Sequence, residues 1–266
     1  MKNFVKSYYE RWHEIVDATY GKEDFLSDRD EIVISLLGRQ NRILEVGCGA
    51  GRVIGLTNAN EKYGIDISKT AIASALKLGI NAQVVDVDEE NLPFESGYFD
   101  GVLAVEILEH VFDPVYVLAE INRVLKEDGV LIVTVPNVGY FKIRLALLFG
   151  RFTDFHGSGL VVDEHIRFYT QTSLEKLVKL SGFEIEKVIG TKKGLASRSF
   201  RNKVGLKLHD DIIEDNLRRL RNKLINIRPS LFGRGLIIKA VRKPMFLRNA
   251  PLDFRKKTLK EKEIHI

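Results

Sequence analysis

The ten residues 42–51, Arg-Ile-Leu-Glu-Val-Gly-Cys-Gly-Ala-Gly, constrain the fold of this 266-residue chain more than any other stretch. Residues 42–46 are mostly apolar and β-forming, as expected of a buried parallel strand. Gly47, Gly49 and Gly51 follow where such a strand turns into a helix. Without Cβ atoms, the backbone can take unusual dihedral angles there and a ligand can lie against it. The segment therefore predicts a strand, a ligand-binding turn and a helix.

The glycine spacing and a neighbouring acid narrow the class of ligand. The glycines follow the pattern G-x-G-x-G, whereas the loops that bind dinucleotide pyrophosphates follow G-x-G-x-x-G. Glu45 lies two residues before the first glycine, where its negative charge would repel a phosphate. The loop therefore suits a ligand that carries positive charge and no phosphate.

Strands and helices are expected to alternate over the first half of the chain. The expected strands are 42–46, 62–66, 82–86, 99–105 and 129–135, and the expected helices between them are 51–59, 68–78 and 114–126. This alternation predicts a parallel sheet with helices on both faces, in which ligands bind at the carboxyl ends of the strands. Four acids lie at or near these ends: Glu45, Asp66, Asp86 and Glu106.

Together these segments resemble the class I S-adenosylmethionine-dependent methyltransferases. Residues 44–51 resemble motif I of that family, 63–68 the end of its second strand, 84–87 the end of its third, and 99–106 motif IV. The resemblance implies an α/β fold, a Rossmann-like seven-stranded and mostly parallel sheet of order 3-2-1-4-5-7-6 with helices on both faces. It also implies S-adenosylmethionine as cofactor and S-adenosylhomocysteine as product.

The resemblance also implies individual cofactor contacts. Asp66 lies about 20 residues after Gly47, the interval that ribose recognition needs, and corresponds to the acid that takes both ribose hydroxyls. Asp86 and Val87 correspond to the pair that reads the adenine edge. The expected cofactor-binding residues are Glu45, Gly47, Cys48, Gly49, Gly51, Asp66, Ile67, Asp86, Val87 and Glu106.

Two histidines are the expected catalytic residues. Methyl transfer is an in-line displacement, so the enzyme mainly aligns the reactants, and a hydroxyl acceptor must also lose its proton. His110 follows the fourth strand, and His165 begins the segment after a polar loop. Imidazole titrates near neutral pH, so each is a candidate general base. The alternative is a structural role, with the imidazole bonded to a backbone carbonyl.

No metal is expected, and a metal site at residues 106–110 is the weaker alternative. Glu106, Glu109 and His110 are spaced i, i+3 and i+4, which would place them on one helical face. The Glu-x-x-Glu-His string resembles the ubiquinone-pathway O-methyltransferases, some of which use Mg²⁺ to orient the acceptor oxygen. Carboxylates suit a hard cation, although histidine is a less usual magnesium ligand.

The acceptor is only partly constrained. Enzymes that methylate exocyclic nitrogens typically carry Asn/Asp-Pro-Pro-Tyr/Phe after strand 4, whereas residues 104–107 here are Ala-Val-Glu-Ile. The expected function is O-methylation of a small-molecule, lipid-linked or sugar acceptor. One alternative is an RNA methyltransferase that uses the basic insertion and tail, so nucleic acid is an unfavoured partner. Another is a non-catalytic accessory protein that retains the cofactor fold.

The segment after strand 5 is expected to cover the acceptor. Residues 135–169 resemble a subgroup that contains the methionine-biosynthesis accessory proteins and methyltransferases of glycan or lipid pathways. An amphipathic helix is expected over 138–149, with Lys142 and Arg144 on its polar side. Two interpretations are open: an interfacial helix that makes peripheral membrane contact, or a helix packed on the domain with a basic rim.

The expected organisation has three parts. Residues 1–38 form N-terminal helices over the site, from 3–20 and 25–37. The methyltransferase domain is 39–243, with acceptor-side segments 137–170 and 190–233, and 244–266 is a charged tail. The remaining expected elements are a helix at 173–181, strands at 183–189 and 235–241, and a basic helix at 210–226.

Composition supports a cytoplasmic enzyme. The single cysteine excludes an internal disulfide and agrees with a reducing compartment. An apolar stretch of about 18 residues is missing, so no membrane span is expected. The net charge of +5 suits nucleic acid, anionic lipid or phosphorylated metabolites as partners, or simply reflects a surface rich in lysine and glutamate.

Overall fold

The computed structural model describes residue 10 and residues 27–150, 165–191, 219–220 and 222–243. Several predictions lie wholly or largely outside these residues: the helix at 3–20, the loop at 150–164, most of the basic helix at 210–226, and the tail at 244–266. The proposed boundaries of the N-terminal helices, the domain and the tail therefore stay predictions.

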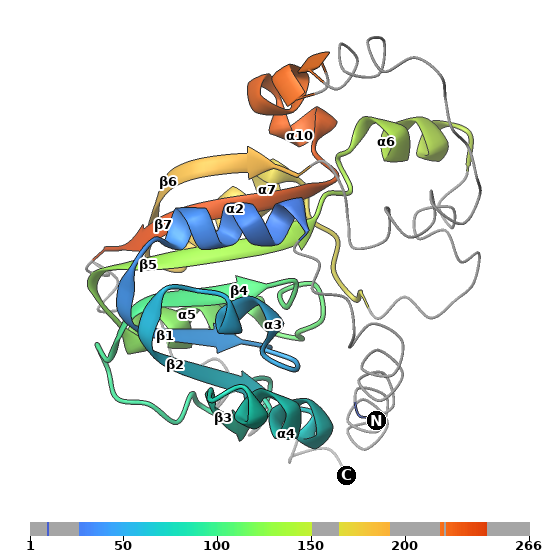
Figure 1. The fold of residues 1–266 in the computed structure, drawn as a ribbon. Coiled ribbons are helices and arrows are strands. Elements are labelled where there is room, and N and C mark those ends of the chain that lie inside the picture. Colours follow the sequence, from blue (N-terminus) through green and yellow to red (C-terminus); the bar gives the residue numbers. More distant parts are fainter. Residues whose placement is uncertain (1–9, 11–26, 151–164, 192–218, 221, 244–266) are drawn as a thin grey trace, which may run out of the picture.

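Seven strands form one sheet in the order β3-β2-β1-β4-β5-β7-β6, as Figure 1 shows. The strands are β1 (Gln40–Val46), β2 (Ala59–Asp66), β3 (Asn81–Val84), β4 (Phe99–Val105), β5 (Leu125–Pro136), β6 (Phe183–Gly190) and β7 (Gly235–Arg242). Every neighbouring pair from β3 to β5 is parallel, whereas β7 is antiparallel to both β5 and β6. The predicted α/β class, strand order and mostly parallel pairing are confirmed.

Helices join these strands and cover both faces of the sheet (Figure 1). The helices are α2 (Asp28–Leu37), α3 (Arg52–Gly55), α4 (Lys69–Lys77), α5 (Pro114–Val124), α6 (Phe141–Leu148), α7 (Gln171–Leu180) and α10 (Pro229–Phe232). Ser27 begins α2 and Thr170 begins α7, each with a capping box that satisfies free backbone amides. Along the residues that the structure describes, no helix is long and apolar enough to span a membrane.

Two apolar clusters hold the layers together, one on each face of the sheet. On one face, Ile121 of α5 and Val178 of α7 pack against strand residues such as Val102. On the other face, Leu37 of α2 packs with residues such as Leu103. These side chains are fully or almost fully buried, and each contributes roughly 1.5–3 kcal/mol through removal of apolar surface from water. Alternate residues of β4 thus serve opposite faces, which fixes its register.

Two predicted boundaries are wrong near the sheet. The helix expected at 51–59 ends at Gly55, because glycine favours helix poorly and β2 already begins at Ala59. The hydroxyl of Thr57 donates to the carbonyl of Ile54 at 2.6 Å and closes this short turn. In addition, β5 begins at Leu125, earlier than expected, because Leu125 already pairs with Phe99 of β4.

Candidate functional site

The glycine loop, residues 47–51, has a backbone that only glycine adopts easily. Gly47, Gly49 and Gly51 have φ values of 71°, 52° and 81°. A Cβ atom on Gly47 would lie 2.8 Å from Ile107, and one on Gly51 would lie 2.3 Å from Ile80. A Cβ atom at Gly47 or Gly51 would force the end of the Ile107 or Ile80 side chain to move, so space restricts these two positions in addition to the positive φ that all three glycines share.

Glu45 lies beneath this loop, and its side chain reaches the helix that follows. Its carboxylate accepts a hydrogen bond from the amide of Ile54 in α3 at 3.1 Å, and the residue is only 2% exposed. Burial raises its pKa to about 8. Glu45 therefore ties β1 to α3, and its predicted contact with the cofactor stays a prediction.

Cys48 fills the space inside the turn. The residue is 5% exposed, and a Cβ atom on Gly64 of β2 would lie 2.7 Å from its sulfur. Burial raises the pKa of the thiol, so the reactive thiolate is disfavoured. These two observations favour a packing role for this cysteine over a nucleophilic one.

Asp66 lies beside the glycine loop at the end of β2, and Asp86 follows the neighbouring strand β3. Asp66 accepts hydrogen bonds from the amides of Gly49 and Ser68, each at 2.9 Å, and so joins the loop to the start of α4. Asp86 lies two residues beyond the end of β3, where its carboxylate accepts from the amide of Asp88 at 3.1 Å. Ile67 and Val87, the residues that follow these acids, are both half-buried.

Glu106 is held in a strained conformation directly after β4. Its φ of 51° is unusual for any residue other than glycine and carries a cost of about 1–3 kcal/mol. Thr134 of β5 donates to its carboxylate at 2.7 Å and accepts from its amide at 3.1 Å. Arg29 of α2 lies 3.6 Å from its other carboxylate oxygen. An acid that several contacts hold in a strained conformation at a strand end is typical of a binding site.

An ion-pair network beside the glycine loop was missed by the sequence analysis. Asp30 of α2 is fully buried and accepts from Arg29 at 3.0 Å and from Arg52 at 2.6 Å. Burial alone would raise the pKa of Asp30, but the two guanidinium groups outweigh it and lower that pKa. The only sequence signal was the Ser-x-x-Asp capping pattern of α2, which predicts a helix start and not this network.

Glu10 was also missed, and it contacts the start of α4. Its carboxylate accepts from the amides of Lys69 at 2.7 Å and Thr70 at 3.1 Å, and from the hydroxyl of Ser68 at 3.0 Å. Burial raises its pKa, but these hydrogen bonds outweigh burial and lower the pKa to about 2. Glu10 therefore reaches the same helix start that Asp66 holds from the other side.

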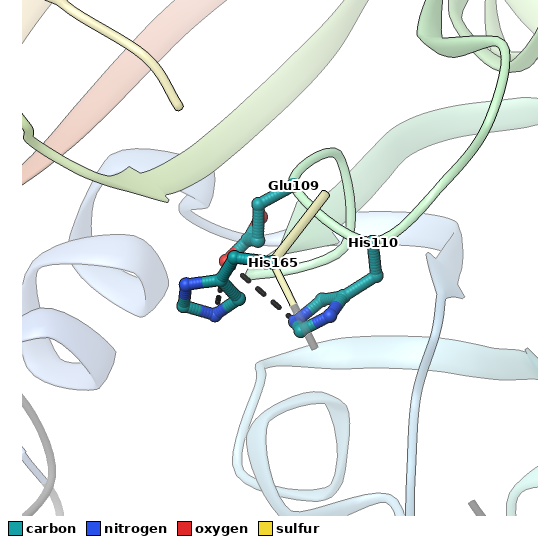
Figure 2. A group of neighbouring side chains, drawn as sticks. All are labelled: Glu109, His110 and His165. Atoms are coloured by element: carbon teal, nitrogen blue, oxygen red, sulfur yellow. Dashed lines mark ion pairs between the residues drawn. The ribbon is translucent and has the colours of Figure 1, made fainter. Parts of the chain in front are cut away.

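The histidine cluster consists of Glu109, His110 and His165. The Nε2 atoms of His110 and His165 lie 3.9 Å and 4.0 Å from the same oxygen, Oε1 of Glu109. Figure 2 shows both rings turned toward this carboxylate, and the ring centroids are 4.7 Å apart. The side chain of Glu109 is 1% exposed, and those of the histidines are 15% and 17% exposed.

Backbone hydrogen bonds fix His165 against the turn that carries the other two residues. The amides of Ile166 and Arg167 both donate to the carbonyl of Glu109, at 3.0 Å and 3.2 Å. The guanidinium of Arg167 donates to the carbonyls of Val111, at 3.1 Å, and Phe112. The two predicted catalytic histidines are therefore brought together by a strap of residues 165–169 on residues 108–112.

The predicted metal site required residues 106–110 to be helical, and this prediction is wrong. Residues 106–110 form a turn, in which the amide of His110 donates to the carbonyl of Ile107 at 3.0 Å. The strained φ of Glu106 ends the strand and directs this residue toward Arg29 and Thr134. The ligand atoms that lie within 4.8 Å of one another belong to Glu109, His110 and His165, a set without Glu106.

These strand ends define a nucleoside-binding Rossmann-like domain. Residues 44–133 match the family model described as a methyltransferase domain. An uncharacterized protein of Methanocaldococcus jannaschii is 28% identical over 201 residues, 70% of this chain and 79% of the relative. A probable S-adenosylmethionine-dependent methyltransferase of Mycolicibacterium smegmatis is 26% identical over 174 residues, 64% of this chain and 63% of the relative.

Solved structures share the fold. An S-adenosylmethionine-dependent methyltransferase of Thermotoga maritima, described as a possible histamine N-methyltransferase, has a TM-score of 0.56 at 23% identity and covers 91% of this chain and 97% of its own. Another from Archaeoglobus fulgidus has a TM-score of 0.53 at 20% identity, covering 86% and 94%. At these identities the likeness shows the fold alone.

Residues 44–133 therefore form a methyltransferase domain of the class I S-adenosylmethionine-dependent type, whose cofactor is S-adenosylmethionine. The residues present fit this cofactor, because Gly47, Gly49 and Gly51 place no side chain on the loop and Asp66 joins that loop to the end of β2. The carboxylates of Asp66 and Asp86 add acceptors for hydroxyl and amine donors at the adjoining strand ends.

Proposed function

We propose that this chain transfers a methyl group to an oxygen atom, with His110 and His165 as the groups that take the acceptor's proton. The observation that carries the proposal is the convergence of both imidazoles on the buried carboxylate of Glu109, one turn beyond Glu106 at the carboxyl edge of β4. A hydroxyl is a weak nucleophile until it loses its proton, so an oxygen acceptor benefits from such a base more than a thiol does.

Each group of residues has a separate role in the proposed reaction. S-Adenosylmethionine, when bound, supplies the methyl group from its sulfonium. The glycine loop and Asp66 hold and orient the cofactor side, whereas Glu109 orients the imidazoles and stabilises the positive charge that either gains with a proton. Removing one general base is expected to slow transfer by about 10²–10⁴-fold.

The proposed base is tested by comparing His110→Ala and His165→Ala at saturating cofactor. We expect methyl transfer to fall by about 10²-fold or more in at least one variant, while the dissociation constant for S-adenosylmethionine changes by less than about threefold. The matched control is Glu95→Gln, which changes an exposed carboxylate elsewhere on the domain. Unchanged transfer in both histidine variants would contradict the proposed base.

The exposed surface of α6 favours a lipid-linked acceptor within the small-molecule, lipid or sugar classes. No residue of α6 is buried, although the Phe141 ring lies beside that of Phe232 in α10. The exposed apolar residues of this segment are Phe141, Leu145, Leu147, Leu148 and Phe149, of which Leu148 is 77% exposed. Lys142 lies among them and is also exposed, which suits an anionic membrane surface.

Vesicle binding tests this part of the proposal. The chain is expected to co-sediment with phosphatidylglycerol vesicles, and the double variant Leu148→Ser/Phe149→Ser is expected to lose most of that binding. Leu78→Ser is the matched control, because Leu78 is 61% exposed but follows α4. Equal binding by both variants would contradict the interfacial interpretation of α6.

The chemical class of acceptor is tested by transfer of labelled methyl groups to a fractionated cell extract. We expect label in the lipid-extractable fraction, as an ether or ester that mass spectrometry identifies. Label confined to RNA would favour the nucleic-acid alternative. Cofactor binding with no labelled fraction would favour an accessory protein without turnover.

A further inference from the structure

The histidine cluster has the shape and the donor set of a metal site that the Glu106-containing pattern did not predict. Three ligand atoms, one from each of Glu109, His110 and His165, lie within 4.8 Å of one another. The distances of 3.9 Å and 4.0 Å from the carboxylate oxygen to the two Nε2 atoms exceed the 2.7–3.2 Å of hydrogen bonds. Both rings face the carboxylate across a gap of these dimensions (Figure 2).

The size of this gap suits a small divalent ion. Zinc binds histidine nitrogen and carboxylate oxygen at about 2.0–2.2 Å, which places two tetrahedral ligands about 3.4 Å apart. Each Nε2 atom would therefore approach the carboxylate oxygen by about 0.5–0.6 Å, and the two histidine ligand atoms would approach each other by at most about 1.4 Å, changes that side-chain rotations supply. The ion would still have at least one open position, since these residues offer three ligand atoms.

Burial and charge also favour an ion. The side chain of Glu109 is 1% exposed, and burying a carboxylate is costly unless a positive charge compensates it. Two protonated imidazoles with centroids 4.7 Å apart would repel each other. One divalent ion instead serves both neutral rings and the carboxylate together.

The protein holds the three ligands in place before any ion binds. The two amides of Ile166 and Arg167 on the carbonyl of Glu109 fix the backbone on either side of the cluster. Tyr169, which follows in the same segment, donates its hydroxyl to the carbonyl of Leu108 at 3.1 Å. A ligand set that is organised in this way loses less conformational entropy when it binds an ion.

We infer that Glu109, His110 and His165 bind one divalent transition-metal ion. Two imidazoles and one carboxylate are a ligand set of zinc and of ferrous iron, whereas magnesium prefers oxygen ligands throughout. With the ion bound, His110 and His165 are ligands and not bases. The open position would take the acceptor's oxygen and make its hydroxyl more acidic, so that the proton passes to water. This catalytic role rests on the proposed O-methylation, but the binding of the ion does not.

Zinc titration of the untagged full chain, after removal of metal by EDTA, tests the site. We expect one Zn²⁺ per chain by isothermal titration calorimetry and by elemental analysis after dialysis. His110→Ala, His165→Ala and Glu109→Gln are each expected to weaken binding by at least about tenfold. Glu106→Gln is the matched control, because it removes the rival carboxylate of the sequence pattern and should leave zinc affinity unchanged.

His165→Cys guards against a variant that merely misfolds, because it restores a zinc ligand on the same segment. It is expected to bind Zn²⁺ more tightly than His165→Ala, while both bind S-adenosylmethionine like the wild-type chain. Failure of the wild-type chain to bind Zn²⁺, or equal zinc affinity in His165→Ala, would overturn the site. Full methyl transfer by the metal-free chain would overturn the catalytic role of the ion and leave the proposed O-methylation standing.

Discussion

The glycine loop is held by contacts between neighbouring strand ends that are close in sequence, whereas the histidine cluster joins distant parts of the chain. Gly49 and Asp66, which share a hydrogen bond, are 17 residues apart. Arg167 and Val111, which hold the cluster, are 56 residues apart, and Tyr169 and Leu108 are 61 apart. The glycine loop and its partner Asp66 can be recognised from short sequence motifs, whereas the histidine cluster depends on tertiary structure.

The glycine loop and the strap 165–169 are also stabilised by different kinds of contact. The glycine loop is packed so closely that a Cβ atom would collide, and its acid Glu45 is buried in the core between β1 and α3. The strap 165–169 instead holds to the turn 108–112 mainly through hydrogen bonds to carbonyl groups. Changes to the cofactor side should therefore affect folding and cofactor binding together, whereas changes to the strap should affect transfer alone.

The largest expected effect is that of Gly51→Ala. Its φ of 81° and the 2.3 Å approach to Ile80 add backbone strain to overpacking, so we expect a loss of about 2–5 kcal/mol in the free energy of unfolding and weaker cofactor binding. Gly97→Ala is the control, because Gly97 has a φ of 70° with nothing within 4 Å of its Cβ position. Urea unfolding checks both, and equal losses would show that close packing of the loop is unimportant.

Arg167→Ala tests the strap with the next largest effect. Without the hydrogen bonds from Arg167 to Val111 and Phe112, His165 should be misplaced, and we expect kcat to fall by about 10-fold to 100-fold. The affinity for S-adenosylmethionine should stay within about twofold, as it should in the control Arg42→Ala, which breaks an ion pair with Glu61 on β2. A parallel loss of cofactor affinity in Arg167→Ala would contradict the separation of the two sides.

A smaller, pH-dependent effect is expected of Glu45→Gln. The folded chain keeps a proton on Glu45 up to a pH of about 8, whereas the unfolded chain releases it near the ordinary pKa of 4.5. The folded state therefore binds more protons between these values, and the free energy of unfolding contributed by this group falls as the pH rises from about 4.5 to 8. The variant should show a flatter dependence of Tm on pH over that window. The same slope as in the wild-type chain would show that Glu45 is not buried as a neutral acid.

The smallest effect is expected of Glu10→Gln. Its pKa is lowered to about 2, so the stability it contributes is present above the ordinary value of 4.5 and is lost as the pH falls from 4.5 toward 2. The variant should lower Tm by no more than about 2 °C at neutral pH, and the difference should disappear near pH 2. A difference that persists at the acid end of the curve would show that charge on Glu10 is not its cause.

Much of the fold and of the cofactor side could be predicted from the sequence because both depend on local patterns. Apolar runs predict the strands, and the glycines at 47, 49 and 51 and the acid at 66 stand at their ends. The turn at 106–110 could not be predicted, since the spacing of Glu106, Glu109 and His110 fits a helix equally well. The positive φ of Glu106, which excludes the helix, is imposed by Thr134 of a different strand.

The histidine cluster and the Arg29–Asp30–Arg52 network could not be predicted from the sequence either. His110 and His165 were each identifiable as candidates, but their common partner Glu109 became evident only when the strap was placed on the turn. Arg29 and Arg52 lie on different helices and meet at Asp30, which the capping pattern of α2 marks only as a residue of a helix start. Residues that meet only through tertiary structure have no characteristic spacing by which the sequence could reveal them.

The role of the two histidines in methyl transfer is best tested with the double variant His110→Ala/His165→Ala. Its single-turnover rate is measured at saturating S-adenosylmethionine, with an acceptor fraction that the wild-type chain labels. We expect the double variant to bind the cofactor with wild-type affinity and to transfer the methyl group at least about 10²-fold more slowly. Transfer at the wild-type rate with the cofactor fully bound would contradict that role.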